Sequence, residues 1–350
     1  MWQIDNRTPF AVERSWVRGR DGSEIWLVAV KASFDIAADG RLEISQQQPP
    51  VLRLPLYHGA EGASSIKYEA DLVLTKKTSD VILVGHAWAP AGTAVTKTDV
   101  GLRIGPLQKV LRVYGDRVWG TLGPSTPEPF QKMPLVYERA YGGTDAKSSR
   151  PDRDWDWRNP VGCGYAVASS HATGTKLPNI EYPDCLISSW RDRPPPAGFG
   201  AIASHWEPRA GYAGTYDAHW MATRQPLLAH DLDDRHFQCA PADQQTPEFL
   251  RGGEAVTLIN LHPRGRIQFT LPKLYLGFDT RFYDGSHQLH QHRRLHTVIL
   301  EPDIPRVSLV WHSMLPCHSQ VHQLERTIVT QKTDLSTGKR QPDDADLELA

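Results

Sequence analysis

A short acidic run is the strongest candidate for acid–base or metal-assisted chemistry in this sequence. It contains Asp231, Asp233 and Asp234, followed by Arg235 and His236. Neighbouring carboxylates shift one another's pKa values and can together hold a hard cation. The run therefore predicts either a metal-assisted hydrolase site or a hydrated loop in which Arg235 pairs with one acid. We favour the loop. No nucleophile–base pair can be identified elsewhere from spacing alone.

The densest group of histidines could bind a metal ion. It comprises His287, His290, His292 and His296. On a strand, His290 and His292 would project from the same face, so a two-ligand site is geometrically possible. His318 and His322 have the spacing of a zincin helix, but Ser319 stands where that motif has Glu. We expect clustered surface imidazoles and no required metal.

A second acidic run imitates the start of an EF-hand calcium loop, with Asp152, Asp154 and Asp156 at alternating positions. That loop needs Gly at its sixth position for a sharp turn and a bidentate Glu at its twelfth. Trp157 and Cys163 occupy those positions here. The template fails, so we expect no calcium site.

The glycines around Cys163 resemble the opening of a dinucleotide-binding fingerprint, since Gly162 and Gly164 flank it. Val167 replaces the third glycine, and no strand with a ribose-binding acid frames the segment. P-loop and GxSxG motifs are absent as well. Turn-forming glycines are the better interpretation, and we expect no cofactor.

The net charge and the length of the apolar runs argue against nucleic-acid and membrane partners. The 350 residues carry 39 Lys and Arg against 40 Asp and Glu, a net charge of -1, which gives no long-range field for gathering phosphates. The longest apolar runs, such as residues 81–84, fall far short of the ~20 residues of a membrane span. No secretory signal opens the chain. We therefore expect a cytoplasmic protein with no nucleic-acid partner and no membrane insertion.

The cysteines form no recognisable metal or redox motif. Without a secretory signal they are most simply reduced, and we expect them to be small buried hydrophobic side chains. Their positions, which include no CxxC pair, are Cys163, Cys185, Cys239 and Cys317.

Residues 1–125 are predicted to form short strands, which make up an N-terminal β-rich region. Residues 25–34 are apolar and β-branched, and residues 41–44 alternate polar with apolar after an Asp-Gly turn signal. Together these segments predict a β-hairpin. Regular spacing of further strands between Gly and Pro predicts antiparallel, sandwich-like sheets. Those strands are expected at 68–75, 81–88, 100–104 and 110–114.

The middle of the chain, residues 126–250, is rich in Pro, Gly and Trp and alternates poorly at either period. It predicts ordered loops with one short helix near 216–224, capped by Thr215 and ended by Pro226. A structureless stretch this long would be unusual inside a domain. We therefore expect the loops to pack on the sheets through Trp155, Trp157, Trp190, Trp206 and Trp220.

Strands return in a C-terminal β-rich region, residues 251–330. Residues 255–261 and 266–271 flank one hairpin turn, and residues 274–282 and 286–292 flank another. Strands are also expected at 297–300 and 306–311, followed by a flexible polar tail at 331–350. The expected fold class is mainly β, a β-rich α+β protein with sheets from both chain ends and a loop-rich middle.

Several segments together resemble the DUF2169 family of bacterial proteins. The resemblance extends in order over about residues 1–315, and no single motif is needed to carry it. The matching segments are 6–10 (NRTPF), 30–35 (VKASFD), 138–145 (ERAYGGTD), 159–165 (NPVGCGY), 177–181 (LPNIE), 198–200 (GFG), 206–209 (WEPR), 214–217 (GTYD), 240–244 (APADQ) and 260–263 (NLHP).

The resemblance implies a role in type VI secretion without enzymatic activity. Members of the family are linked to effector adaptors or chaperones, which bind a toxin effector and help to load it onto a spike of VgrG and PAAR proteins. The resemblance supplies no catalytic residues. It singles out motif residues that could form an interface or determine the fold: Arg139, Tyr141, Gly142, Gly143, Asn159, Tyr165, Trp206 and Arg209.

Two hypotheses thus remain, an adaptor and a metal-assisted hydrolase that uses residues 231–236. An adaptor should expose an apolar patch for a partner protein. A hydrolase should have a deep pocket with converging acids.

Overall fold

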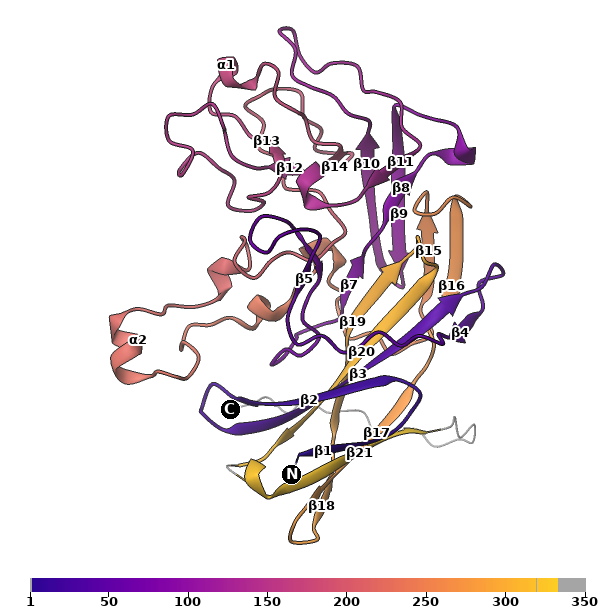
Figure 1. Ribbon diagram of the computed structural model, residues 1–350, viewed down its shortest axis with the longest axis vertical. Coiled ribbons are helices and arrows are strands. Elements are labelled where there is room, and N and C mark those ends of the chain that lie inside the picture. Colours follow the sequence, from indigo (N-terminus) through magenta and orange to yellow (C-terminus); the bar gives the residue numbers. More distant parts are fainter. Residues whose placement is uncertain (1, 319, 333–350) are drawn as a thin grey trace.

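Three β-sheets line one hydrophobic core in the computed structural model, which describes residues 2–318 and 320–332 (Figure 1). Strands account for 38% of the chain and helices for 9%, and the sheets are mostly antiparallel. The predicted mainly β fold class is confirmed. Among the described residues, no helix has the length and apolar character needed to cross a membrane.

The largest sheet joins the two ends of the chain. Its central strands β3 and β20 pair from Ile25↔Pro316 to Asp35↔Arg306, and β3 also forms the predicted hairpin with β4. Nearly every β3 residue is buried, because the core covers one face and segment 45–80 covers the other. The six strands are β2 (Ala11–Arg18), β3 (Glu24–Ile36), β20 (Arg306–Pro316), β19 (His292–Glu301), β7 (Asp80–Leu83) and β4 (Leu42–Ile44).

A five-stranded sheet lies against the same core. Its strands alternate buried and exposed residues, so one face packs on the core and the other points outward. The predicted hairpin of residues 255–261 and 266–271 is confirmed as β15 and β16. In order, the strands are β14 (Ile180–Glu181), β10 (Leu107–Tyr114), β9 (Lys97–Ile104), β15 (Ala255–Ile259) and β16 (Arg266–Thr270).

A four-stranded sheet closes the far end of the core (Figure 1). It contains the second predicted hairpin and pairs the first strand with the last in parallel. Its last strand extends two residues into the predicted tail, whose residues 333–350 lie outside the described part. In order, the strands are β1 (Gln3–Arg7), β21 (Leu324–Lys332), β17 (Tyr275–Phe282) and β18 (His287–Leu289).

The loop-rich middle contains short elements and contributes β14 to the five-stranded sheet. Three pairs of short strands lie outside the three sheets in the described chain. The pair β12 (Tyr141–Gly142) with β13 (Cys163–Gly164) belongs to the middle, the pair β8 (His86–Trp88) with β11 (Lys132–Pro134) joins the middle to the N-terminal region, and the pair β5 (Leu56–Tyr57) with β6 (Ile66–Tyr68) precedes it. The helices are α1 (Ser169–Ala172) and α2 (Ala218–Thr223), with 3-10 turns η1 (Pro90–Gly92), η2 (Tyr137–Arg139), η3 (Ala210–Tyr212), η4 (Asp234–Phe237), η5 (Ala242–Gln244) and η6 (Val321–Gln323).

Three local predictions are wrong. The strand expected at 68–75 ends at Tyr68, because the following segment turns its charged side chains down onto the large sheet. The strand expected at 81–88 splits into β7 and β8, which pair with different partners. The helix cap is Asp217, which accepts a hydrogen bond from the Trp220 amide, while Thr215 instead donates to Asp231.

The expected packing of tryptophans and cysteines is correct for some and wrong for others. Trp206, Cys239 and Cys317 are buried as expected. Trp157 and Cys185 are exposed instead, because they lie on loops at the surface of the middle region.

Candidate functional site

Hydrogen bonds join two of the family motifs, residues 138–145 and 159–165, into one turn in the middle region. The Asn159 side chain is buried and donates hydrogen bonds to the backbone carbonyls of Tyr137 and Tyr141, at 2.8 and 3.0 Å. The Gly143 amide donates to the Asn159 carbonyl at 2.8 Å. Strands β12 and β13 pair in parallel beside this contact. Asn159 therefore ties segment 137–143 to segment 159–164.

Glycine is required at two positions of this turn. Gly142 and Gly143 have φ angles of 146° and 84°. A Cβ at either position would lie 2.2 Å from a backbone carbonyl oxygen, that of Asn159 or of Gly162. Because neither backbone can retreat without breaking the turn, these glycines fit the fold-determining interpretation of the motif.

The turn also positions the loop of residues 154–158, here called the indole loop. The Asp145 amide donates to the Asp154 carbonyl, and the Asp156 amide donates to the Gly143 carbonyl. The rings of Trp155 and Trp157 stack with centroids 4.3 Å apart and planes 27° apart. Trp157 nevertheless remains 61% exposed. The hydrogen-bonded backbone thus holds a stacked aromatic pair in which Trp155 is half-buried and Trp157 is exposed.

Three other motif residues surround this turn. Arg139 is half-buried, and its Nη1 donates to Asp116 and Asn179, both at 2.9 Å. Tyr141 is buried, and burial raises its pKa to about 12. The Tyr165 ring is covered by the Arg193 guanidinium at 4.8 Å. Each side chain has a contact within the described chain.

Trp206 and Arg209 lie in a separate buried part of the middle region, where it packs against Ile66 and Ile82. Trp206 packs its ring edge-on against Tyr137 at 5.8 Å. The buried Arg209 donates to the Glu69 carboxylate at 2.5 Å and to the carbonyls of Ile202 and His236. In this chain their side chains are occupied by internal contacts.

A buried ion pair that the sequence did not signal lies at the centre of the structure. Lys76 Nζ contacts Asp80 Oδ2 at 2.5 Å and donates to Thr297 Oγ1 at 3.0 Å. Asp80 also accepts hydrogen bonds from the Gln238 side chain and the Cys239 amide. Burial opposes the charge of Lys76, but the neighbouring Asp80 outweighs it, so the pKa of Lys76 is raised. Neither residue belongs to a recognisable motif.

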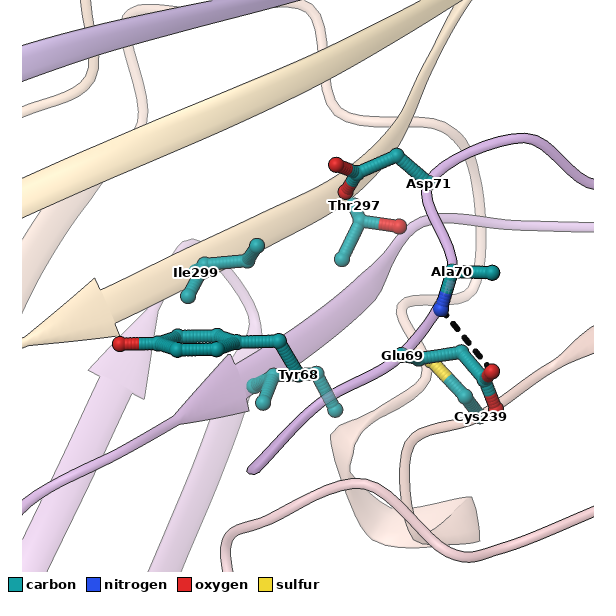
Figure 2. Close-up of a pocket in the computed structure, with 8 residues that line it drawn as sticks. Tyr68, Glu69, Ala70, Asp71, Cys239, Thr297 and Ile299 are labelled. Carbon is teal, nitrogen blue, oxygen red and sulfur yellow. Dashed lines mark hydrogen bonds between the residues drawn. The ribbon is translucent and has the colours of Figure 1, made fainter. Parts of the chain in front are cut away.

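A narrow cavity lies beside this pair. Figure 2 shows Tyr68, Asp71, Cys239 and Thr297 among its lining residues. The lining comes from segment 68–71, strand β7, Cys239 and strand β19. Its volume is about 10 Å³, room for one water molecule. Ligand pockets for small molecules usually have volumes of roughly 300–1,000 Å³.

Two buried imidazoles lie on the same face of the large sheet. The rings of His296 and His312 are 4.0 Å apart, and His312 Nε2 contacts the Asp71 carbonyl at 2.5 Å. Burial lowers the pKa of His312 to about 3 and holds that of His296 well below its usual value. Lys76 and Arg294 face these rings and lower the His296 pKa further.

The structure does not bring the predicted histidine group together. His287 is exposed and contacts Asp279 at 3.0 Å, whereas His290 is buried between Thr280 and Ser313. The side chain of His292 lies outside the described atoms. Within residues 2–318 and 320–332, no group of three or more His, Cys, Asp or Glu is arranged to hold a metal ion.

The acids of the 231–236 run turn to separate partners. Asp231 accepts from the amide and hydroxyl of Thr215, and Asp234 pairs with Arg20 at 2.6 Å. Asp233 caps η4 and accepts from the Arg235 guanidinium, and these hydrogen bonds lower its pKa. This arrangement matches the loop interpretation.

These features define a mainly β protein whose middle region presents a rigid aromatic pair on a loop. The chain belongs to the DUF2169 family, described as an uncharacterized protein conserved in bacteria, whose sequence profile matches residues 21–312. The predicted family is confirmed. No curated protein and no solved structure matches the chain.

Gly143 and Gly174 have similar positive φ angles, 84° and 80°, but different surroundings. Gly143→Ala should lower the free energy of unfolding by about 1–3 kcal/mol more than Gly174→Ala, since only the former forces a Cβ against a carbonyl. A Cβ at Gly174 meets nothing within 4 Å. Urea unfolding measures the difference. Equal losses in the two variants would contradict the role of the turn.

The second prediction concerns pH. Because the pKa values of His296 and His312 are lowered in the folded state, their contribution to stability is complete above the unfolded pKa of about 6.5 and is lost as pH falls below it. Each histidine should contribute about 1.4 kcal/mol per pH unit below that point. Urea unfolding of the wild type between pH 7.5 and 5 measures this slope.

His312→Gln should flatten the slope, whatever its effect on stability at neutral pH. His287→Gln, at an exposed position, is the control and should leave the slope unchanged. A His312→Gln slope equal to that of the wild type would show that His312 does not fold as a neutral buried group.

Proposed function

We propose that this protein is a non-enzymatic adaptor or chaperone that binds a type VI secretion effector and helps to load it onto the VgrG/PAAR spike. Its partners are then the toxin effector and the spike components, which it meets in the cytoplasm. The proposal gives it no role in binding nucleic acid or inserting into a membrane.

The indole loop is the observation that carries this proposal. Trp155 and Trp157 stack on a backbone that the Asn159 turn fixes, so little conformational entropy would be lost when a partner binds. Tryptophan is among the residues that most often dominate the energy of a protein interface. An exposed Trp157 that is stacked on a half-buried Trp155 is therefore the kind of anchor that an adaptor needs.

Two further observations support the same proposal. The family match agrees with the resemblance from which the secretion role was inferred. The acids of the 231–236 run are held by separate partners, and the cavity beside Lys76 has room for about one water molecule. Neither feature favours the alternative of a metal-assisted hydrolase.

The third prediction tests this role. Deletion of the gene should stop the secretion of one effector while other cargo of the same machine is still exported. Purified full-length protein should form a complex with that effector, and Trp157→Ala should weaken the complex by at least about thirtyfold, the loss expected of an interface anchor. Isothermal titration calorimetry measures the affinity.

Tyr283→Ala is the matched control, because Tyr283 is an aromatic residue of similar exposure, 57%, on another part of the surface. It should leave the affinity unchanged. The adaptor proposal would be wrong if the deletion left every effector secreted normally, or if Asp233→Ala abolished a measurable hydrolytic activity.

A further inference from the structure

The outward face of the five-stranded sheet carries exposed side chains over β9, β10, β15 and β16, whereas β14 at its edge is buried. Alternation along β9, β10 and β16 points every second side chain away from the core. Figure 1 shows these strands at the side of the molecule. The exposed side chains on this face include Lys97, Arg103, Gln108, Val110, Arg266 and Gln268.

A short aliphatic strip lies at the centre of this face. Val110, Gly101 and Ile259 stand opposite one another on three neighbouring strands. Gly101 has no side chain, and a Cβ there would make ordinary van der Waals contact with Ile259 at 3.7 Å. The strip could therefore contact an apolar side chain from another molecule.

Lysine and arginine side chains without acidic partners surround this aliphatic strip. Lys97, Arg103 and Arg266 form no ion pair with any described residue. Asp99 is the one acid that points outward from β9, β10, β15 and β16, all of which the structure describes in full, and Arg112 binds it through two hydrogen bonds of 2.8 and 2.9 Å. The local charge is thus positive on a chain with a net charge of -1.

The outward face of the four-stranded sheet is different. Its arginines have their own acids, since Arg7 pairs with Asp5 at 2.7 Å and Arg281 approaches Asp279 at 3.8 Å. These arginines therefore differ from Arg103 and Arg266 of the five-stranded sheet, which pair with no acid in the described part of the chain.

A groove continues the charged face past its edge strand. It has a volume of about 270 Å³ and lies between β16 and the turn at 37–40. Arg264 and Arg266 line it, and its one acid, Asp39, pairs with Arg41 at 2.6 Å. The groove adds Arg264 to the unpaired cations.

We propose that this surface docks an acidic, partly apolar segment of a partner protein. We call it the basic sheet face and define it by Lys97, Gly101, Arg103, Ile259 and Arg266. Lys97 and Arg103 are about 20 Å apart along β9, so an extended segment of about seven residues spans the face. Every second side chain of such a segment points toward the sheet, and these side chains match the face when they are acidic at the ends of the segment and apolar between them. The inference rests on the proposed function, because an adaptor needs separate surfaces for effector and spike.

The chemistry of the face favours a protein over a nucleic acid. Single-stranded nucleic acids bind to sheets mainly by stacking bases on exposed aromatic rings. Tyr114 is the aromatic residue that points outward from these four fully described strands, and the Arg117 guanidinium already covers its ring at 3.9 Å. The centre of the face is aliphatic instead.

Fluorescence anisotropy with the full-length protein tests the proposal. The probe is a labelled synthetic peptide of about eight residues whose every second residue is in turn Glu, Val, Val and Glu, with Ser between them, so that one side of the extended chain is acidic at its ends and apolar between them and is long enough to span the face. It should bind the wild type, and high salt should weaken binding. Charge reversal by Arg103→Glu with Arg266→Glu should weaken it at least about tenfold, and Gly101→Val should do the same because a branched side chain would stand between Val110 and Ile259 and hold the peptide away from the sheet.

Three controls make the test specific. Arg7→Glu with Arg281→Glu, on the other sheet, should leave binding unchanged. A peptide with Lys in place of Glu should not bind. A single-stranded oligonucleotide should bind more weakly than the acidic peptide.

The proposal is overturned if the acidic peptide does not bind, if the charge-reversed variant binds it as well as the wild type does, or if the oligonucleotide binds more tightly. These outcomes do not depend on the indole loop. A failure here beside an intact, Trp157-dependent effector complex would leave the adaptor role standing, and the converse result would refute the adaptor role alone.

Discussion

The ion pair between Lys76 and Asp80 lies where three parts of the chain meet. Asp80 begins strand β7 of the large sheet, Lys76 belongs to the segment that crosses this sheet, and the Cys239 amide that binds Asp80 comes from the middle region. Removing one partner of such a pair leaves a buried charge and typically costs about 3–5 kcal/mol. Through Asp80 the pair therefore links the irregular middle of the chain to the large sheet. A second buried pair, Lys31 with Asp71, holds the same crossing segment to β3.

The aromatic surface depends on this attachment through a series of contacts. Tyr137 and Trp206 pack in the buried part of the middle region, together with Cys239. The Tyr137 carbonyl in turn accepts a hydrogen bond from Asn159, whose turn fixes the indole loop. Most of the family motif thus acts at a distance from the surface. In our account its role is to hold Trp157 in place, while partner contacts fall to exposed residues outside the motif.

The sequence predicted the regular parts of this fold better than the irregular ones. Regular spacing between Gly and Pro identified β9 and β10, and turn signals identified the hairpins of β3 with β4 and β15 with β16, because these features depend on neighbouring residues. The segment after Tyr68 was misassigned as a strand, since its conformation depends on burying Asp71 and Lys76 against distant residues.

The candidate site was predictable to a similar extent. The glycines and Asn159 were singled out as motif residues, but their role required the backbone distances of the turn. A buried Trp206 and an exposed Trp157 are indistinguishable in sequence. The basic sheet face was not foreseen, because its residues come from strands more than 150 positions apart in the chain, as the pairing of Gly101 with Ile259 illustrates.

Hydrogen–deuterium exchange of the full-length protein, with and without the effector whose export requires it, tests most directly whether the protein is an adaptor that uses these surfaces. We expect added protection in the indole loop at residues 154–158, with the buried strands β3 and β20 unchanged. When spike components join the complex, we expect further protection in β9 and β16. Protection confined to the segments around the Lys76 cavity, or none in any described segment, would contradict the account.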